Sequence, residues 1–112
     1  MAAERPPERV LVPLGRFDWE RVIRSFEVDP TTKLVALMAA TYAGKKGNHV
    51  RPGEQLLATD CGLGASTVRK HLARLVTLGL LDLVSRGGGP NRRASEYRLV
   101  APEGTQVTGD LS

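Results

Sequence analysis

Apolar residues recur at helical spacing in several stretches of this chain. In the first stretch Trp19, Val22, Ile23 and Phe26 follow an i, i+3, i+4, i+7 pattern, which predicts an amphipathic helix capped by Asp18. We expect its apolar stripe to pack on the core. The alternative is a dimer contact, because a stripe of large residues suits either use.

A second helix is predicted from Asp29, a good N-cap, and from Pro30, whose missing N–H costs nothing in a first turn. Its expected buried face consists of Leu34, Leu37, Met38 and Thr41. A third helix is predicted to start near Pro52 and to end near Cys61. Its apolar residues are Leu56, Leu57 and Ala58.

A tight turn over Gly62–Gly64 separates the third helix from a fourth, predicted over residues 65–78. Its buried face comprises Val68, Leu72, Leu75 and Val76. On the opposite side lie Ser66, Lys70, Arg74 and Thr77, flanked by Thr67 and Arg69. This helix therefore presents a polar, basic face away from the core.

Two strands, Leu81–Ser85 and Ser95–Val100, are predicted to form a hairpin around the glycine-rich basic loop 86–93. Residues 1–15 are expected to form a flexible arm that ends in a short extended segment near Val10–Val12, and residues 102–112 a disordered tail, because neither shows sustained periodicity. The structured domain then covers residues 16–101. The predicted fold class is mainly α with a small β-hairpin, that is, α+β.

The composition excludes several classes of protein. A length of 112 residues suits one domain, and the single cysteine rules out an intrachain disulfide framework and a thiolate-rich zinc site. His49 and His71 lie far apart in sequence, so we expect no metal and no cofactor. There is no apolar run of 18 or more residues, and this predicts a soluble, cytoplasmic protein without a membrane partner.

Charge is distributed unevenly along the chain. Residues 62–100 carry seven basic side chains against Asp82 and Glu96, whereas residues 1–61 have nine basic and eight acidic side chains. A basic half on a small domain indicates a polyanionic partner, chiefly nucleic acid, although a basic surface that serves solubility is the alternative.

The order helix, glycine turn, helix and basic hairpin resembles a winged helix-turn-helix domain. Residues 51–88 resemble the DNA-binding region of GntR-type regulators and of related actinobacterial plasmid and phage helix-turn-helix proteins. The matching positions are Pro52, Glu54, Leu57, Ala58, Gly62, Leu63, Thr67, Val68, Arg69, Leu72, Leu75, Gly79, Leu80 and Leu81. The chain departs from the family at Gly64 and Ala65, where Ser and often Arg are usual, so the cap of the fourth helix is weaker.

The resemblance implies that the fourth helix enters the major groove of duplex DNA. Its candidate DNA-binding residues are Ser66, Thr67, Arg69, Lys70 and Arg74. Arg86, Arg92 and Arg93 are candidates for a wing on the minor groove or the backbone. Lys45, Lys46 and Arg51 are weaker candidates for phosphate contacts.

We therefore expect a nucleoid-associated protein that binds double-stranded DNA sequence-specifically, as a small transcriptional regulator. A plasmid or phage accessory factor for replication initiation or excision is the alternative. From another class, a winged helix that binds a protein partner through the helix of Trp19 and Phe26 fits the same pattern. No nucleophile–base set is evident, so we expect no enzyme.

Overall fold

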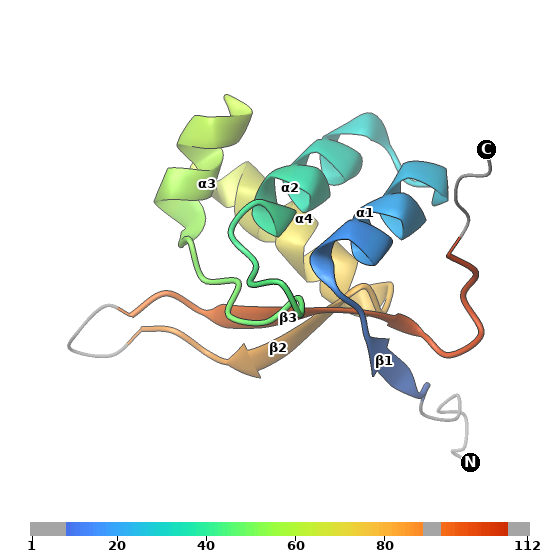
Figure 1. The fold of residues 1–112 in the computed structure, drawn as a ribbon. Coiled ribbons are helices and arrows are strands. Elements are labelled where there is room, and N and C mark those ends of the chain that lie inside the picture. Colours follow the sequence, from blue (N-terminus) through green and yellow to red (C-terminus); the bar gives the residue numbers. More distant parts are fainter. Residues whose placement is uncertain (1–8, 89–92, 108–112) are drawn as a thin grey trace, which may run out of the picture.

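The computed structural model describes residues 9–88 and 93–107, which form four helices and a three-stranded antiparallel sheet. This is the predicted α+β class, and its layout fits a winged helix-turn-helix (Figure 1). The helices are α1 (Arg16–Ser25), α2 (Pro30–Ala40), α3 (Glu54–Cys61) and α4 (Ala65–Thr77). The strands are β1 (Leu11–Pro13), β2 (Leu81–Ser85) and β3 (Glu96–Pro102).

The sheet lies beneath the helices, and β3 is its central strand (Figure 1). On one side β2 pairs antiparallel with β3, from Leu81 opposite Leu99 to Ser85 opposite Glu96. On the other side β1 pairs with the end of β3, and Val50 forms an isolated bridge with Tyr97. The loop before α3 is thereby attached to the sheet.

The apolar stripe of α1 belongs to the core. Trp19, Val22 and Ile23 are at most 1% exposed, and Phe26 packs half-buried against them. The indole Nε1 of Trp19 donates to the carbonyl oxygens of Leu80 and Val100, at 2.9 Å each. The core role is confirmed, and the alternatives of a dimer contact or a partner site on this stripe are wrong, because these side chains are already enclosed.

Helix α1 begins earlier than predicted. Gly15 is its N-cap and makes no side-chain cap hydrogen bond, whereas Asp18 lies inside the first turn. The carboxylate of Asp18 accepts from Arg21 at 3.2 Å and favours the helix there through the macrodipole. The predicted cap was wrong because acidic residues suit both the N-cap and the first turn.

The N-cap of α2 is confirmed, but the predicted buried face is wrong. The carboxylate of Asp29 accepts from the backbone N–H of Thr32 at 3.1 Å. Leu34 is 40% exposed, and Leu37 and Met38 are only partly buried. The residues that α2 buries are Thr32, Val35, Ala36, Ala39 and Ala40. Small side chains allow α3 and α4 to pack close to α2, so Leu37 and Met38 lie at the margin of the core and Leu34 lies at the surface.

The predicted flexible arm over residues 1–15 needs correction at its end. Backbone pairing with β3 orders Leu11–Pro13, and the N–H of Leu14 donates to Leu99 at 3.1 Å. The end of the arm is the extended segment that the sequence led us to expect, but three residues carry no periodic signal that could indicate its pairing with β3. Likewise β3 extends to Pro102, into the expected tail. Residues 1–8 and 108–112 lie outside the described part of the chain.

Candidate nucleic-acid interface

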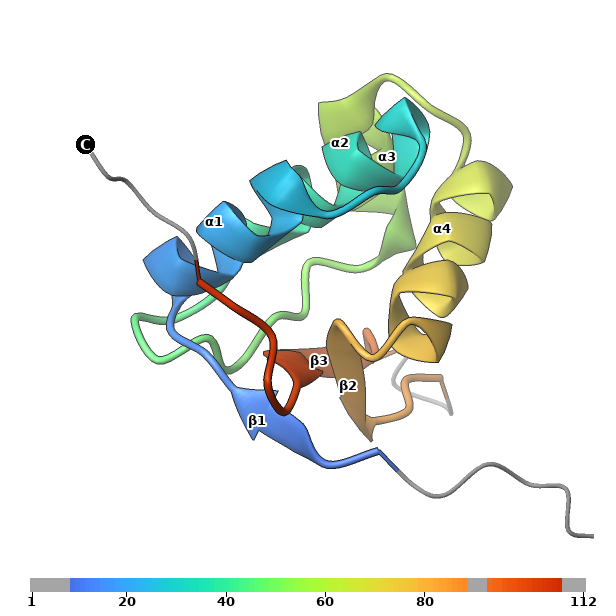
Figure 2. The same cartoon turned by 90° about the vertical axis from the view of Figure 1, so that its right-hand side faces the viewer.

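Helix α4 is fixed by the predicted apolar face. Val68 and Leu75 are fully buried and Leu72 is 5% exposed, which confirms their place in the core. They pack α4 against α2 and α3, and the start of β2 follows directly after the helix. The opposite face of α4 therefore has a defined orientation relative to the rest of the domain (Figure 2).

The turn into α4 requires glycine at one of its two glycine positions. Gly62 has φ +71°, a left-handed conformation that L-residues rarely adopt, and the N–H of Leu63 returns to the carbonyl of Ala58. Gly64 has an ordinary φ of −77° and is the N-cap of α4 without a side-chain hydrogen bond. The weaker cap is thus confirmed, and no side chain satisfies the first N–H groups of α4 at this cap.

The exposed face of α4 contains the residues that its periodicity placed there. Thr67 is partly buried at its edge. The exposed residues are Ser66, Arg69, Lys70, Arg74 and Thr77. Lys70 has no ion pair within the described residues, so its ammonium group is available to a ligand.

Arg69 is held by a carboxylate from the neighbouring helix. Its Nε lies 3.1 Å from each carboxylate oxygen of Glu54, and its Nη2 donates to Oε1 at 2.9 Å. This bidentate contact raises the pKa of the Arg69 guanidinium. The pair remains exposed to solvent, so its main consequence is orientation rather than stability.

A second carboxylate, that of Asp29, lies beside Arg74 on the other edge of α4. Arg74 Nε lies 3.6 Å from Asp29 Oδ1, and Thr32 Oγ1 donates to the same oxygen at 2.7 Å. Thr32 Oγ1 also lies 2.7 Å from Nδ1 of His71 on α4, so the threonine joins the two helices. The hydrogen bonds from Thr32 lower the pKa of Asp29, which stays ionised beside Arg74.

The wing is the hairpin that extends beyond β2 and β3. Arg86 and Arg93 are exposed, and neither makes an ion pair within the described residues. Gly88 bridges Arg93, and the N–H of Gly87 donates to Ser95 Oγ at 2.9 Å, which closes the base of the hairpin. Arg92 lies outside the described residues.

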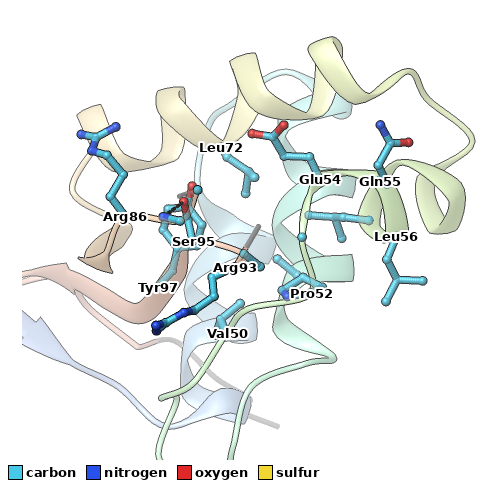
Figure 3. A pocket seen from close by; sticks show the side chains of 16 residues that line it. Val50, Pro52, Glu54, Gln55, Leu56, Leu72, Arg86, Arg93, Ser95 and Tyr97 are labelled. Atoms are coloured by element: carbon cyan, nitrogen blue, oxygen red, sulfur yellow. Dashed lines mark hydrogen bonds between the residues drawn. The ribbon is translucent and has the colours of Figure 1, made fainter. Parts of the chain in front are cut away.

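A groove of about 690 Å³ separates the wing from α3 and α4. Its floor includes Val50, Leu72 and Tyr97. Figure 3 shows the carboxylate of Glu54 directed toward α4, and the guanidinium groups of Arg86 and Arg93 directed away from one another at the wing end. The wing arginines thus frame the groove without filling it.

The three weaker candidates fall into two places. The backbone carbonyl of Lys45 accepts from the N–H of Arg16, which places Lys45 and Lys46 beside the start of α1. Figure 2 shows this loop on the side of the molecule away from α4. Arg51 lies instead beside β3, 3.7 Å from Glu96. The structure therefore does not bring Lys45 and Lys46 to the face of α4.

Within the described residues no group of three or more His, Cys, Asp or Glu side chains could hold a metal ion. Cys61, the last residue of α3, packs against the core, and its burial together with the charge of Asp60 raises the pKa of its thiol. A redox sensor needs a depressed thiol pKa, so this environment argues against that role.

Comparison with known families supplies the decisive observation. Residues 29–81, from the N-cap of α2 to the start of β2, match the family model of a helix-turn-helix domain. This segment is a helix-turn-helix domain. Searches of curated proteins and of solved structures found no match to the chain. The closer resemblance to GntR-type regulators stays a prediction.

The helix-turn-helix assignment supports DNA binding. None of the helices in the described part of the chain has the length and apolarity needed to cross a membrane.

The domain also contains the two carboxylates that orient its arginines, Glu54 and Asp29. The sequence did not indicate these pairings because the carboxylates are distant along the chain from the arginines, although Glu54 and Arg69 are both positions of the family resemblance.

Proposed function

We propose that this protein binds duplex DNA sequence-specifically, with α4 in the major groove and the wing on the minor groove or the backbone. The observation that carries the proposal is the exposed face of α4, where Arg69 and Arg74 are oriented by carboxylates of two different helices. Oriented arginines can contact guanine bidentately. Lys70 and Ser66, which are exposed on the same face of α4, can reach bases or phosphates.

The N-terminus of α4 supports the same docking. Gly64 leaves the first N–H groups of the helix without a side-chain cap, and the helix dipole adds partial positive charge there. A phosphate group that approaches this end finds free donors and no nearby carboxylate on α4 itself, since the first turn of α4 has no acidic residue.

The wing supports a second, less selective contact. Arg86 and Arg93 are exposed on a hairpin beside the groove that borders α4. Neither has a carboxylate partner, within the described residues, that fixes its direction, so both suit phosphates or a narrow minor groove. Arg92, which the sequence places on the same loop, is proposed to act with them.

We propose that the cellular role is that of a small transcriptional regulator. A replication-initiation or excision accessory factor of a plasmid or phage is the alternative, because the same interface serves each role. Genome-wide mapping of bound sites separates them: clustered promoters favour a regulator, whereas an origin or an attachment site favours an accessory factor.

The primary test is in vitro selection from a random duplex library, followed by titration of the selected duplex and a scrambled duplex at several salt concentrations. We expect a defined motif, tighter binding to it, and affinity that falls as salt rises. Equal affinity for the two duplexes would contradict sequence-specific recognition, and salt-independent binding or none would contradict DNA binding altogether.

A further inference from the structure

The outer face of α1 carries a stripe that neither the core nor the proposed DNA interface uses. Phe17, Glu20, Arg21 and Arg24 lie at i, i+3, i+4 and i+7, on the side of α1 opposite Trp19 and Ile23. We call these four residues the outer stripe. Phe17 is 66% exposed, which is unusual for a phenylalanine in a domain with so few aromatic residues.

The outer stripe borders a shallow hollow. Its four residues and Leu37 of α2 line a depression of about 510 Å³ between the two helices. Leu34, one turn before Leu37, is 40% exposed. Leu37 is partly buried against the core, so the hollow combines the apolar side chains of Phe17 and Leu37 with three charged ones.

The charges of the outer stripe are ordered along the helix. Glu20 precedes Arg21 at its centre, and Phe17 and Arg24 lie at equal distances on either side of that pair. When two such helices cross antiparallel about a two-fold axis between residues 20 and 21, Glu20 faces the partner's Arg21. Phe17 then faces the partner's Arg24. The stripe is complementary to itself, as an isologous contact requires.

We propose that a second copy of this chain docks antiparallel on the outer stripe. The ion pair and the aromatic–guanidinium contact then each form twice. Within one chain Glu20 accepts from Arg16 at 3.0 Å, and Arg21 donates to Asp18 at 3.2 Å. The side chains of Glu20 and Arg21 remain 25% and 41% exposed in these contacts, so a partner can reach both.

This surface leaves the proposed DNA interface free. Figure 2 shows α1 and α4 on opposite sides of the helical layer, above the sheet. Two copies joined through α1 therefore expose two α4 faces, each of which can bind a duplex. The dimer itself does not depend on the proposed DNA binding, so either proposal can fail without the other.

The test uses complementary charge reversals in the full chain. Glu20→Arg puts two arginines at the centre of the contact, and Arg21→Glu puts two glutamates there. Each variant alone should raise the dimer Kd about tenfold or more, because the like-charged pair occurs twice. A 1:1 mixture of the two variants restores opposite charges across the contact and should recover association.

The mixture distinguishes docking from local damage to α1. Each substitution also opposes a neighbour, Arg16 or Asp18, but that repulsion persists in the mixture, so only contact between chains explains recovery. Asp82→Arg and Arg98→Glu are the matched control, since this pair faces across β2 and β3 on the sheet. Neither control variant, alone or mixed, should change association.

Sedimentation equilibrium from about 10 to 500 µM gives the readout, and circular dichroism verifies folding of each variant. A wild-type dimer, weakened in each single variant and recovered in the mixture, supports the proposal. A wild-type monomer over the whole range overturns it. A dimer that the reversals leave unchanged also overturns it, because the contact then lies elsewhere.

Discussion

Helix α4 and the wing carry basic residues of the same kind in opposite structural settings. On α4, Arg69 is bound by Glu54 and Arg74 lies beside Asp29, and the helix itself is packed on a buried core. On the wing, Arg86 and Arg93 extend from a hairpin closed by a few hydrogen bonds, without an ion pair in residues 9–88 and 93–107.

The difference indicates that α4 and the wing have different roles in the proposed DNA binding. A side chain that is oriented before binding loses less conformational entropy and can enforce one hydrogen-bond geometry, as base recognition requires. A side chain with several accessible rotamers follows a phosphate equally well on any sequence. We therefore expect α4 to determine specificity and the wing to contribute affinity.

The largest expected effect comes from removing the support of α4. Leu72 is 5% exposed between α4 and its neighbours, and Leu72→Ala should lower the free energy of unfolding by about 2–5 kcal/mol. Thermal or urea unfolding measures it. Leu56 on α3 is 47% exposed, and Leu56→Ala should cost less than about 0.5 kcal/mol. Equal losses in the two variants would contradict the assignment of the buried face.

The sequence predicted the core packing of α4 better than it predicted the ion pairs of the arginines on this helix. The period of Val68, Leu72 and Leu75 and the glycine turn are local signals, and the structure confirms both. The pairing of Arg69 with Glu54 spans 15 residues and depends on how two helices cross, which no local period encodes.

The predicted buried face of α2 was wrong for a related reason. Large apolar residues dominate a periodicity argument, but the helices approach each other so closely that Ala36, Ala39 and Ala40 occupy the contact. The sequence indicated a short extended segment near β1 but not its place in the sheet, because that place comes from backbone pairing with β3. Close packing and backbone pairing are tertiary effects, so a single sequence reveals them poorly.

The next effect separates α4 from the wing directly. Arg69→Ala and Lys70→Ala should each cost about 1–3 kcal/mol of binding to the selected duplex and relax the preference at one base pair. Binding to a random duplex should fall much less. The measurement is the ratio of the two Kd values at fixed salt. If neither substitution changes this ratio, α4 is not the element that reads the sequence.

The carboxylate partner of Arg69 sharpens that experiment. Glu54→Gln keeps the size of the side chain but removes the charge that orients the guanidinium. We expect discrimination between the selected and random duplexes to fall, while affinity for the random duplex rises because a negative charge near the phosphates is removed. Opposite changes in these two quantities distinguish loss of orientation from loss of folding, which would weaken both.

A smaller and more uniform effect is expected from the wing. Arg86→Ala combined with Arg93→Ala should weaken binding to both duplexes by nearly the same factor. The slope of log K against log salt should become shallower by about 0.9 for each phosphate that the wing no longer neutralises. Replacement by lysine keeps the charge and should preserve the slope. A change in base preference would instead assign the wing to a narrow minor groove.

The smallest effect tests the uncapped start of α4. Gly64 is exposed with an ordinary φ, and a Cβ there meets no atom within 4 Å, so side chains fit. Gly64→Ser should stabilise the fold by a few tenths of a kcal/mol through a new cap. Gly64→Asp should stabilise it similarly, aided by the helix dipole.

The two substitutions should differ in their effect on DNA binding. The aspartate brings a negative charge to the end of α4 where we place a phosphate, so Gly64→Asp should weaken binding to selected and random duplexes alike, whereas Gly64→Ser should change it far less. Unfolding in urea and titration of both duplexes measure the two quantities on the same samples. Unchanged DNA affinity in the aspartate variant would show that no phosphate approaches the N-terminus of α4.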